Sequence, residues 1–146
     1  MTARLQHCGL LVADLDRSRR FYGDALGLEE VPRPPNFTFA GAWFRLGDSE
    51  IHLLAEADST GRAGAFEPGP GIAGGLATHL AVEVDALAPW QERLHEHGIS
   101  PASGPMPRGD GAVQLFVFDP VGYVVELFER TGDDQSGAPE RVPIRA

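Results

Sequence analysis

Two stretches of sequence decide the fold: QHCGLLVADLD at residues 6–16 and THLAVEVDALA at residues 78–88. Each is an apolar run of strand length that carries a histidine near its start and passes through aspartate into a helical pattern. His7 and His79 occupy equivalent places in these runs. The match predicts that each histidine lies on the opening strand of a repeated unit.

A helical pattern follows each opening strand. In the first half, Asp14 or Asp16 can cap a helix whose apolar positions fit a 3.6-residue period, and Gly27 supplies its left-handed stop. Gly98 plays the same part in the second half. The apolar face of that second helix carries Leu87, Trp90 and Leu94.

Strand-like runs follow each helix after a stretch broken by prolines. The order is strand, helix and three strands, and it occurs twice, which indicates an internal duplication. We therefore expect an α+β fold of two tandem βαβββ modules, whose curved mixed sheets form half-barrels around a metal cleft. The clearest of these runs are residues 42–46 and 50–55 in the first half and 112–118 and 123–129 in the second.

The composition excludes several classes of protein. The chain has 146 residues, of which 42% are hydrophobic and 23% charged, as in ordinary globular domains. Its net charge is −9 and all 12 basic residues are arginine, so we expect no nucleic acid and no membrane partner. The single cysteine, Cys8, excludes an internal disulfide. Without a long apolar run, we expect a cytoplasmic protein.

Four side chains at repeat-equivalent strand positions are candidate metal ligands. His7 and His52 lie on the first and last strands of the first unit, and His79 and Glu126 on those of the second. If both units curl, the four side chains converge. Three imidazoles and a carboxylate suit Zn²⁺, Fe²⁺, Ni²⁺, Mn²⁺ or Co²⁺. Each residue alone also has a structural interpretation, as a hydrogen-bonded histidine or a charge on an edge strand.

The side chains that alternate toward the cleft are candidate substrate contacts. They are Trp43 and Arg45 in the first unit and Gln114 and Phe116 in the second. Arg45 or Arg108 can bind a carboxylate or phosphate through its guanidinium fork. An equally good interpretation pairs Arg45 with a surface acid and places Trp43 in the core.

Three motifs resemble the vicinal oxygen chelate superfamily. They are residues 7–12, the helix phrase from Phe21-Tyr22 through residues 26–28, and residues 119–127. This superfamily includes glyoxalase I, fosfomycin-resistance enzymes, methylmalonyl-CoA epimerase, extradiol dioxygenases and bleomycin-binding proteins. His52 departs from the pattern, because glyoxalase-like and epimerase-like members commonly carry Glu or Gln there.

The resemblance covers about residues 4–130 and implies one domain over residues 1–130. Its parts are module one (4–55), a connecting loop (56–75) and module two (76–130), followed by a polar tail (131–146). The glycine-rich part of the loop is either a lid over the cleft or a plain connector.

The resemblance also implies a function. It places a divalent metal ion on His7, His52, His79 and Glu126, allows Glu126 to serve as the base, and favours a homodimer. Glu83 is a weaker alternative as the base. The implied activity is a glyoxalase I-like lyase or an epimerase-like isomerase acting on a small molecule that chelates the metal through vicinal oxygens. Two alternatives stay open: an Fe²⁺-dependent extradiol-type dioxygenase, and a non-enzymatic protein that binds a drug or a metabolite.

Overall fold

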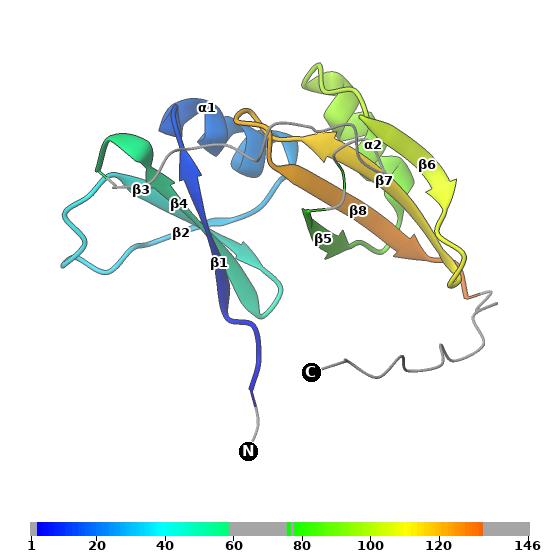
Figure 1. The fold of residues 1–146 in the computed structure, drawn as a ribbon, viewed down its shortest axis with the longest axis horizontal. Coiled ribbons are helices and arrows are strands. Elements are labelled where there is room, and N and C mark those ends of the chain that lie inside the picture. Colours follow the sequence, from blue (N-terminus) through cyan, green and yellow to red (C-terminus); the bar gives the residue numbers. More distant parts are fainter. Residues whose placement is uncertain (1–2, 59–75, 77, 133–146) are drawn as a thin grey trace, which may run out of the picture.

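The computed structural model of the protein describes residues 3–58, 76 and 78–132 (Figure 1). It contains the predicted order of elements twice, so the duplication and the α+β class are confirmed. The first module holds β1 (His7–Val12), α1 (Leu15–Arg19), the π-helix η1 (Arg20–Ala25), β2 (Glu30–Val31), β3 (Gly41–Leu46), β4 (Ser49–Ala55) and the 3₁₀ turn η2 (Glu56–Asp58). The second holds β5 (His79–Glu83), α2 (Leu87–Glu96), β6 (Ser103–Pro107), β7 (Ala112–Phe118) and β8 (Val124–Arg130).

Each module forms a four-stranded mixed sheet with the same topology. The strand orders are β1-β4-β3-β2 and β5-β8-β7-β6. The opening strand pairs in parallel with the closing strand in both sheets, and the other neighbours are antiparallel. The opening strands β1 and β5 therefore lie at sheet edges, and each closing strand lies beside its opening strand.

The helix boundaries follow the predicted signals. Asp14 caps α1, because its carboxylate accepts a hydrogen bond from the backbone N–H of Arg17 at 2.9 Å. Gly27 and Gly98 have positive φ values of 68° and 69°, as expected of helix stops. The first helix changes to π geometry at Arg20, which the sequence pattern does not predict.

The second strand of each module lies beside or within a proline-containing stretch, which made it hard to predict. β2 is only two residues long and ends just before Pro32, whereas β6 itself contains Pro105 and Pro107. Both strands are at the outer edge of their sheet. A proline is tolerated there because its missing N–H need not serve a further strand.

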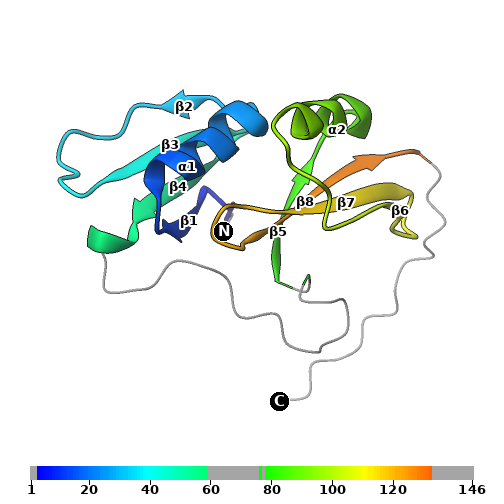
Figure 2. The same ribbon diagram turned by 90° about the horizontal axis from the view of Figure 1, so that it is seen from above.

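The two modules lie side by side, with α1 over the first sheet and α2 over the second (Figures 1 and 2). Contacts from the helical segments join them. The Tyr22 hydroxyl donates a hydrogen bond to Asp119 at 3.0 Å in a buried position, and Arg93 donates one to the backbone carbonyl of Asp24 at 2.9 Å. Burial raises the pKa of Asp119, and it raises the pKa of Tyr22 well above its usual value.

Parts of two predicted segments lie outside the described residues. These are residues 59–75 of the connecting loop, which include the stretch expected to be a lid or a connector, and residues 133–146 of the tail. In the part of the chain that the structure describes, none of the helices combines the length and apolar character needed to cross a membrane.

Candidate functional site

In module one the candidate ligands belong to a stack of aromatic rings. His52 on β4 lies opposite Gly9 of β1 and Trp43 of β3. The Trp43 and His52 rings are 3.8 Å apart between centroids and 1° from parallel. The His7 and His52 rings are 4.2 Å apart and 9° from parallel. Ring planes this close to parallel and 4.2 Å apart do not converge within metal-ligand distance, so both imidazoles can direct in-plane lone pairs at one ion only if a ring turns.

Polar neighbours occupy one nitrogen of each imidazole in this stack. His52 Nε2 lies 2.7 Å from a carboxylate oxygen of Glu50, and His7 Nδ1 lies 2.5 Å from the amide oxygen of Gln6. The hydrogen bond with His52 lowers the pKa of Glu50. The prediction missed Glu50, although strand alternation offered the signal, because Glu50 stands two residues before His52.

A cavity of about 410 Å³ opens beside this stack. Trp43, a predicted substrate contact, lies in its wall together with Phe37 and Phe39 from the loop between β2 and β3. The Phe37 ring meets those of Phe39 and Trp43 edge to face, at centroid distances of 5.2 and 5.3 Å. No periodic pattern marks the two loop phenylalanines, so the sequence alone did not predict them as site residues.

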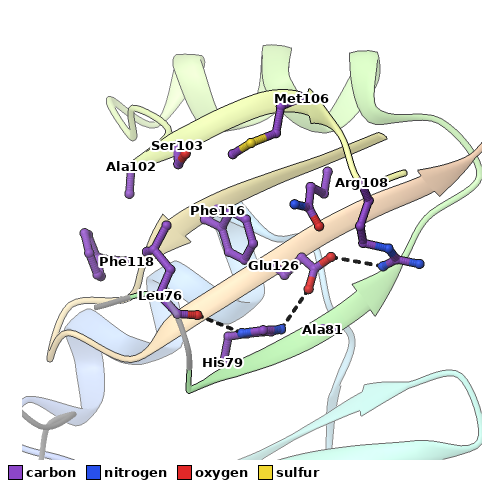
Figure 3. Close-up of a pocket in the computed structure, with 11 residues that line it drawn as sticks. Leu76, His79, Ala81, Ala102, Ser103, Met106, Arg108, Phe116, Phe118 and Glu126 are labelled. Carbon is purple, nitrogen blue, oxygen red and sulfur yellow. Dashed lines mark hydrogen bonds and ion pairs between the residues drawn. The ribbon is translucent and has the colours of Figure 1, made fainter. Parts of the chain in front are cut away.

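In module two the same register brings together an imidazole and a carboxylate. Glu126 on β8 lies opposite Ala81 of β5 and Phe116 of β7, the positions that Gly9 and Trp43 hold in module one. His79 Nε2 lies 2.9 Å from Glu126 Oε2 (Figure 3).

The tautomer of His79 follows from its second contact. Its Nδ1 lies 2.8 Å from the backbone carbonyl oxygen of Leu76, which can only accept, so Nδ1 carries a proton. In the neutral ring, Nε2 then presents a lone pair to the Glu126 carboxylate. That arrangement is favourable only when a proton or a cation lies between the two atoms.

Arg108 contacts the other oxygen of the same carboxylate. Its Nη1 donates to Glu126 Oε1 at 3.1 Å, while Nε and Nη2 donate to the two oxygens of Asp110 at 2.9 and 2.7 Å. The hydrogen bonds between Arg108 and Asp110 raise the pKa of the arginine and lower that of the aspartate. The guanidinium also lies over the Phe128 ring, 4.2 Å from its centroid. Asp110 was not among the predicted site residues.

A cavity of about 1000 Å³ surrounds this carboxylate (Figure 3). Predicted contact residues Gln114, Phe116 and Arg108 line it. The other lining residues are mostly apolar: Leu76, Ala81, Ala102, Ser103, Met106 and Phe118, beside His79 and Glu126.

Two predicted site residues lie outside these cavities. Arg45 is exposed, with Nε 3.3 Å from Glu29, so the interpretation that pairs it with a surface acid fits the structure. Glu83, the alternative base, forms an exposed ion pair with Arg130 at 3.1 Å.

The four candidate ligands form two pairs rather than one cluster. Within residues 3–58, 76 and 78–132, no three His, Cys, Asp or Glu side chains gather closely enough to hold a metal ion. Convergence of all four ligands on one ion therefore stays a prediction. Contacts from the helical segments join the modules, and each sheet has its own cavity.

The duplicated modules and the repeated histidine register define a protein of the paired βαβββ class. The family model of the glyoxalase/bleomycin resistance protein/dioxygenase superfamily matches residues 4–127, and the chain belongs to this superfamily.

Named relatives and solved structures support this assignment. A lactoylglutathione lyase of Haemophilus influenzae is 32% identical over 128 residues, covering 86% of this chain and 92% of that protein. The structure of a glyoxalase/dioxygenase from Nostoc punctiforme is 27% identical, has a TM-score of 0.69, and aligns over 87% of this chain and 90% of its own. A lactoylglutathione lyase structure from Agrobacterium tumefaciens is 27% identical, has a TM-score of 0.62, and aligns over 88% and 94%.

Proposed function

We propose that the protein is a metal-dependent enzyme of the glyoxalase type, a lyase or isomerase whose small substrate presents two adjacent oxygens. One observation carries the proposal: His79 Nε2 and Glu126 Oε2 are 2.9 Å apart, with the second nitrogen of His79 committed to a carbonyl. The names of the relatives favour a lyase over the other activities of the superfamily.

The donor set fits a divalent metal ion. Nitrogen and carboxylate ligands bind such ions at about 2.0–2.2 Å, so two neighbouring ligands of one ion lie roughly 3 Å apart. The separation between His79 and Glu126 meets this requirement without any rearrangement. The hydrogen bond from His79 to the Leu76 carbonyl fixes the orientation of the ring. Metal-ligating histidines are commonly oriented in this way by a hydrogen bond from their second nitrogen.

The residues of the cavity in module two then have distinct roles in the proposed reaction. A bound divalent ion acts as a Lewis acid that polarises the substrate's adjacent oxygens. Glu126 is the group that takes up and returns the proton on the neighbouring carbon. Phe116 and Met106 form apolar walls of the cavity around it. Gln114 supplies an amide for orienting the substrate.

We propose that a homodimer completes the site, with module one of one chain facing module two of the other. Each chain offers two half-sites, His7 with His52 and His79 with Glu126, on separate cavities. The opening strands β1 and β5 lie at sheet edges, where further strands can approach. A twofold arrangement then forms two equivalent sites.

A second candidate is an Fe²⁺-dependent extradiol-type dioxygenase. One observation favours it: because the His7 and His52 rings are nearly parallel, module one presents a single imidazole to an ion. With His79 and Glu126, that leaves a set of two histidines and one carboxylate, which is typical of non-haem Fe²⁺ sites with open positions for O₂.

Metal analysis combined with two assays distinguishes these functions. Untagged protein is analysed for bound metal and assayed for lactoylglutathione formation from a glutathione thiohemiacetal, and for O₂ uptake with a catechol. His79→Ala and Glu126→Gln are expected to lose metal and activity, whereas the control Glu83→Gln keeps both. Protein that cannot be loaded with any divalent metal contradicts both enzymatic proposals and leaves a binding protein.

A further inference from the structure

Glu126 divides its two carboxylate oxygens between two cationic or potentially cationic partners. Oε2 faces His79 Nε2 at 2.9 Å, and Oε1 accepts from Arg108 Nη1 at 3.1 Å. The Glu126 side chain is only 4% exposed, so its charge has lost most of its hydration. A buried carboxylate requires a partner of opposite charge, and Arg108 supplies a permanent one.

We propose that Arg108 is a built-in counter-cation of Glu126 that competes with the divalent metal ion for this carboxylate. The inference rests on the proposed metal site and assigns Arg108 a positioning role in place of the predicted substrate contact. The guanidinium stabilises the metal-free state of Glu126 more than the metal-bound state, because a second cation near the same oxygens is repelled. Arg108 therefore weakens metal binding, and it keeps a partner available when Glu126 acts as base.

Asp110 sets the strength of this competition. It holds two of the three nitrogens of Arg108 at 2.9 and 2.7 Å, which directs the remaining nitrogen at Glu126 and offsets the positive charge of the guanidinium. Removing Asp110 leaves Arg108 fully charged beside Glu126. Removing Arg108 leaves two carboxylates without their cation. The two changes therefore shift metal affinity in opposite directions.

The test compares metal affinity in Arg108→Met and Asp110→Asn. Co²⁺ and Zn²⁺ are titrated into metal-free protein, and binding is measured by Co²⁺ absorption and by competition with a chelating dye. We expect Arg108→Met to bind about tenfold more tightly and Asp110→Asn several-fold more weakly than the unmodified protein. Turnover of Arg108→Met falls, because Glu126 is held more firmly as a ligand.

The chain offers matched controls in a second ion pair beside the same aromatic ring. Arg130 lies 5.6 Å from the Phe128 centroid and pairs with Glu83 at 3.1 Å on the surface. Arg130→Met and Glu83→Gln make the same changes in net charge as the two test variants. Both controls are expected to leave the dissociation constant within about twofold of the original.

The outcomes separate this inference from the proposed function. Metal binding by the unmodified protein together with unchanged or weaker binding by Arg108→Met overturns the counter-cation role and leaves the metal site standing. If the substitutions only loosen the fold, metal affinity falls in both test variants. That result also contradicts the inference, which expects the two affinities to change in opposite directions. Absence of metal binding by the unmodified protein overturns both proposals.

Discussion

The two modules repeat one another in register but differ in what surrounds the candidate ligands. In module one His52 lies opposite Trp43 and stacks on it, and the neighbouring partners are a glutamate and an amide. In module two Glu126 lies opposite Phe116 and is held by a histidine and an arginine. Duplication thus preserved the geometry of the strands, while substitution made one half aromatic and the other ionic. We infer that module two anchors the metal ion and module one completes its coordination.

The largest expected effect is on metal affinity, and it tests this asymmetry. Glu126→Gln removes the proposed charged ligand and is expected to weaken Zn²⁺ binding about a hundredfold or more. His52→Gln removes one of the two stacked imidazoles and leaves the other available to the ion. It is therefore expected to weaken Zn²⁺ binding only about tenfold. Isothermal titration of metal-free protein measures both. Equal losses of Zn²⁺ affinity in the two variants contradict the inference that module two anchors the ion and module one only completes its coordination.

The next effect concerns the buried hydrogen bond between Tyr22 and Asp119, one of the contacts that join the modules. Tyr22→Phe removes the hydroxyl that donates to Asp119, so a buried carboxylate oxygen loses a partner. The free energy of unfolding is expected to fall by about 1–3 kcal/mol. Urea denaturation followed by circular dichroism measures the change. Tyr123→Phe serves as the control, and a Tyr22→Phe variant as stable as that control shows that the modules are held together by other contacts.

The smallest effect comes from making module one resemble module two. His52→Glu places a carboxylate at the position that corresponds to Glu126 and beside Glu50. Two nearby carboxylates repel one another without a cation, so the variant is expected to bind Zn²⁺ about fivefold more tightly. The same titration measures it. Weaker binding by His52→Glu indicates that the imidazole itself is required as a ligand.

The sequence predicted the fold closely because its signals were local. The run 112–118 coincides with β7, and Asp14, Gly27 and Gly98 bound the helices as expected. β6 was harder to predict because it contains prolines, which are tolerated in a strand mainly at a sheet edge.

The site was only partly predictable. Strand alternation was enough to place His52 and Glu126 at equivalent positions. The Arg108–Asp110 pair depends on a hairpin whose side-chain contacts have no sequence signature. Whether two half-sites meet depends on how modules pack, within a chain or between chains, and a hydrophobic pattern carries no information about that choice.

The most direct test of the central claim is complementation between two inactive variants. One chain carries His7→Ala with His52→Ala, and the other His79→Ala with Glu126→Ala, so neither retains a complete set of ligands. Co-expression with two different tags allows the mixed dimer to be isolated and its metal content measured. If half-sites join between chains, the mixed dimer binds about one ion although neither parent does. A mixed dimer as metal-free as its parents, beside an unmodified protein that binds metal, contradicts the account.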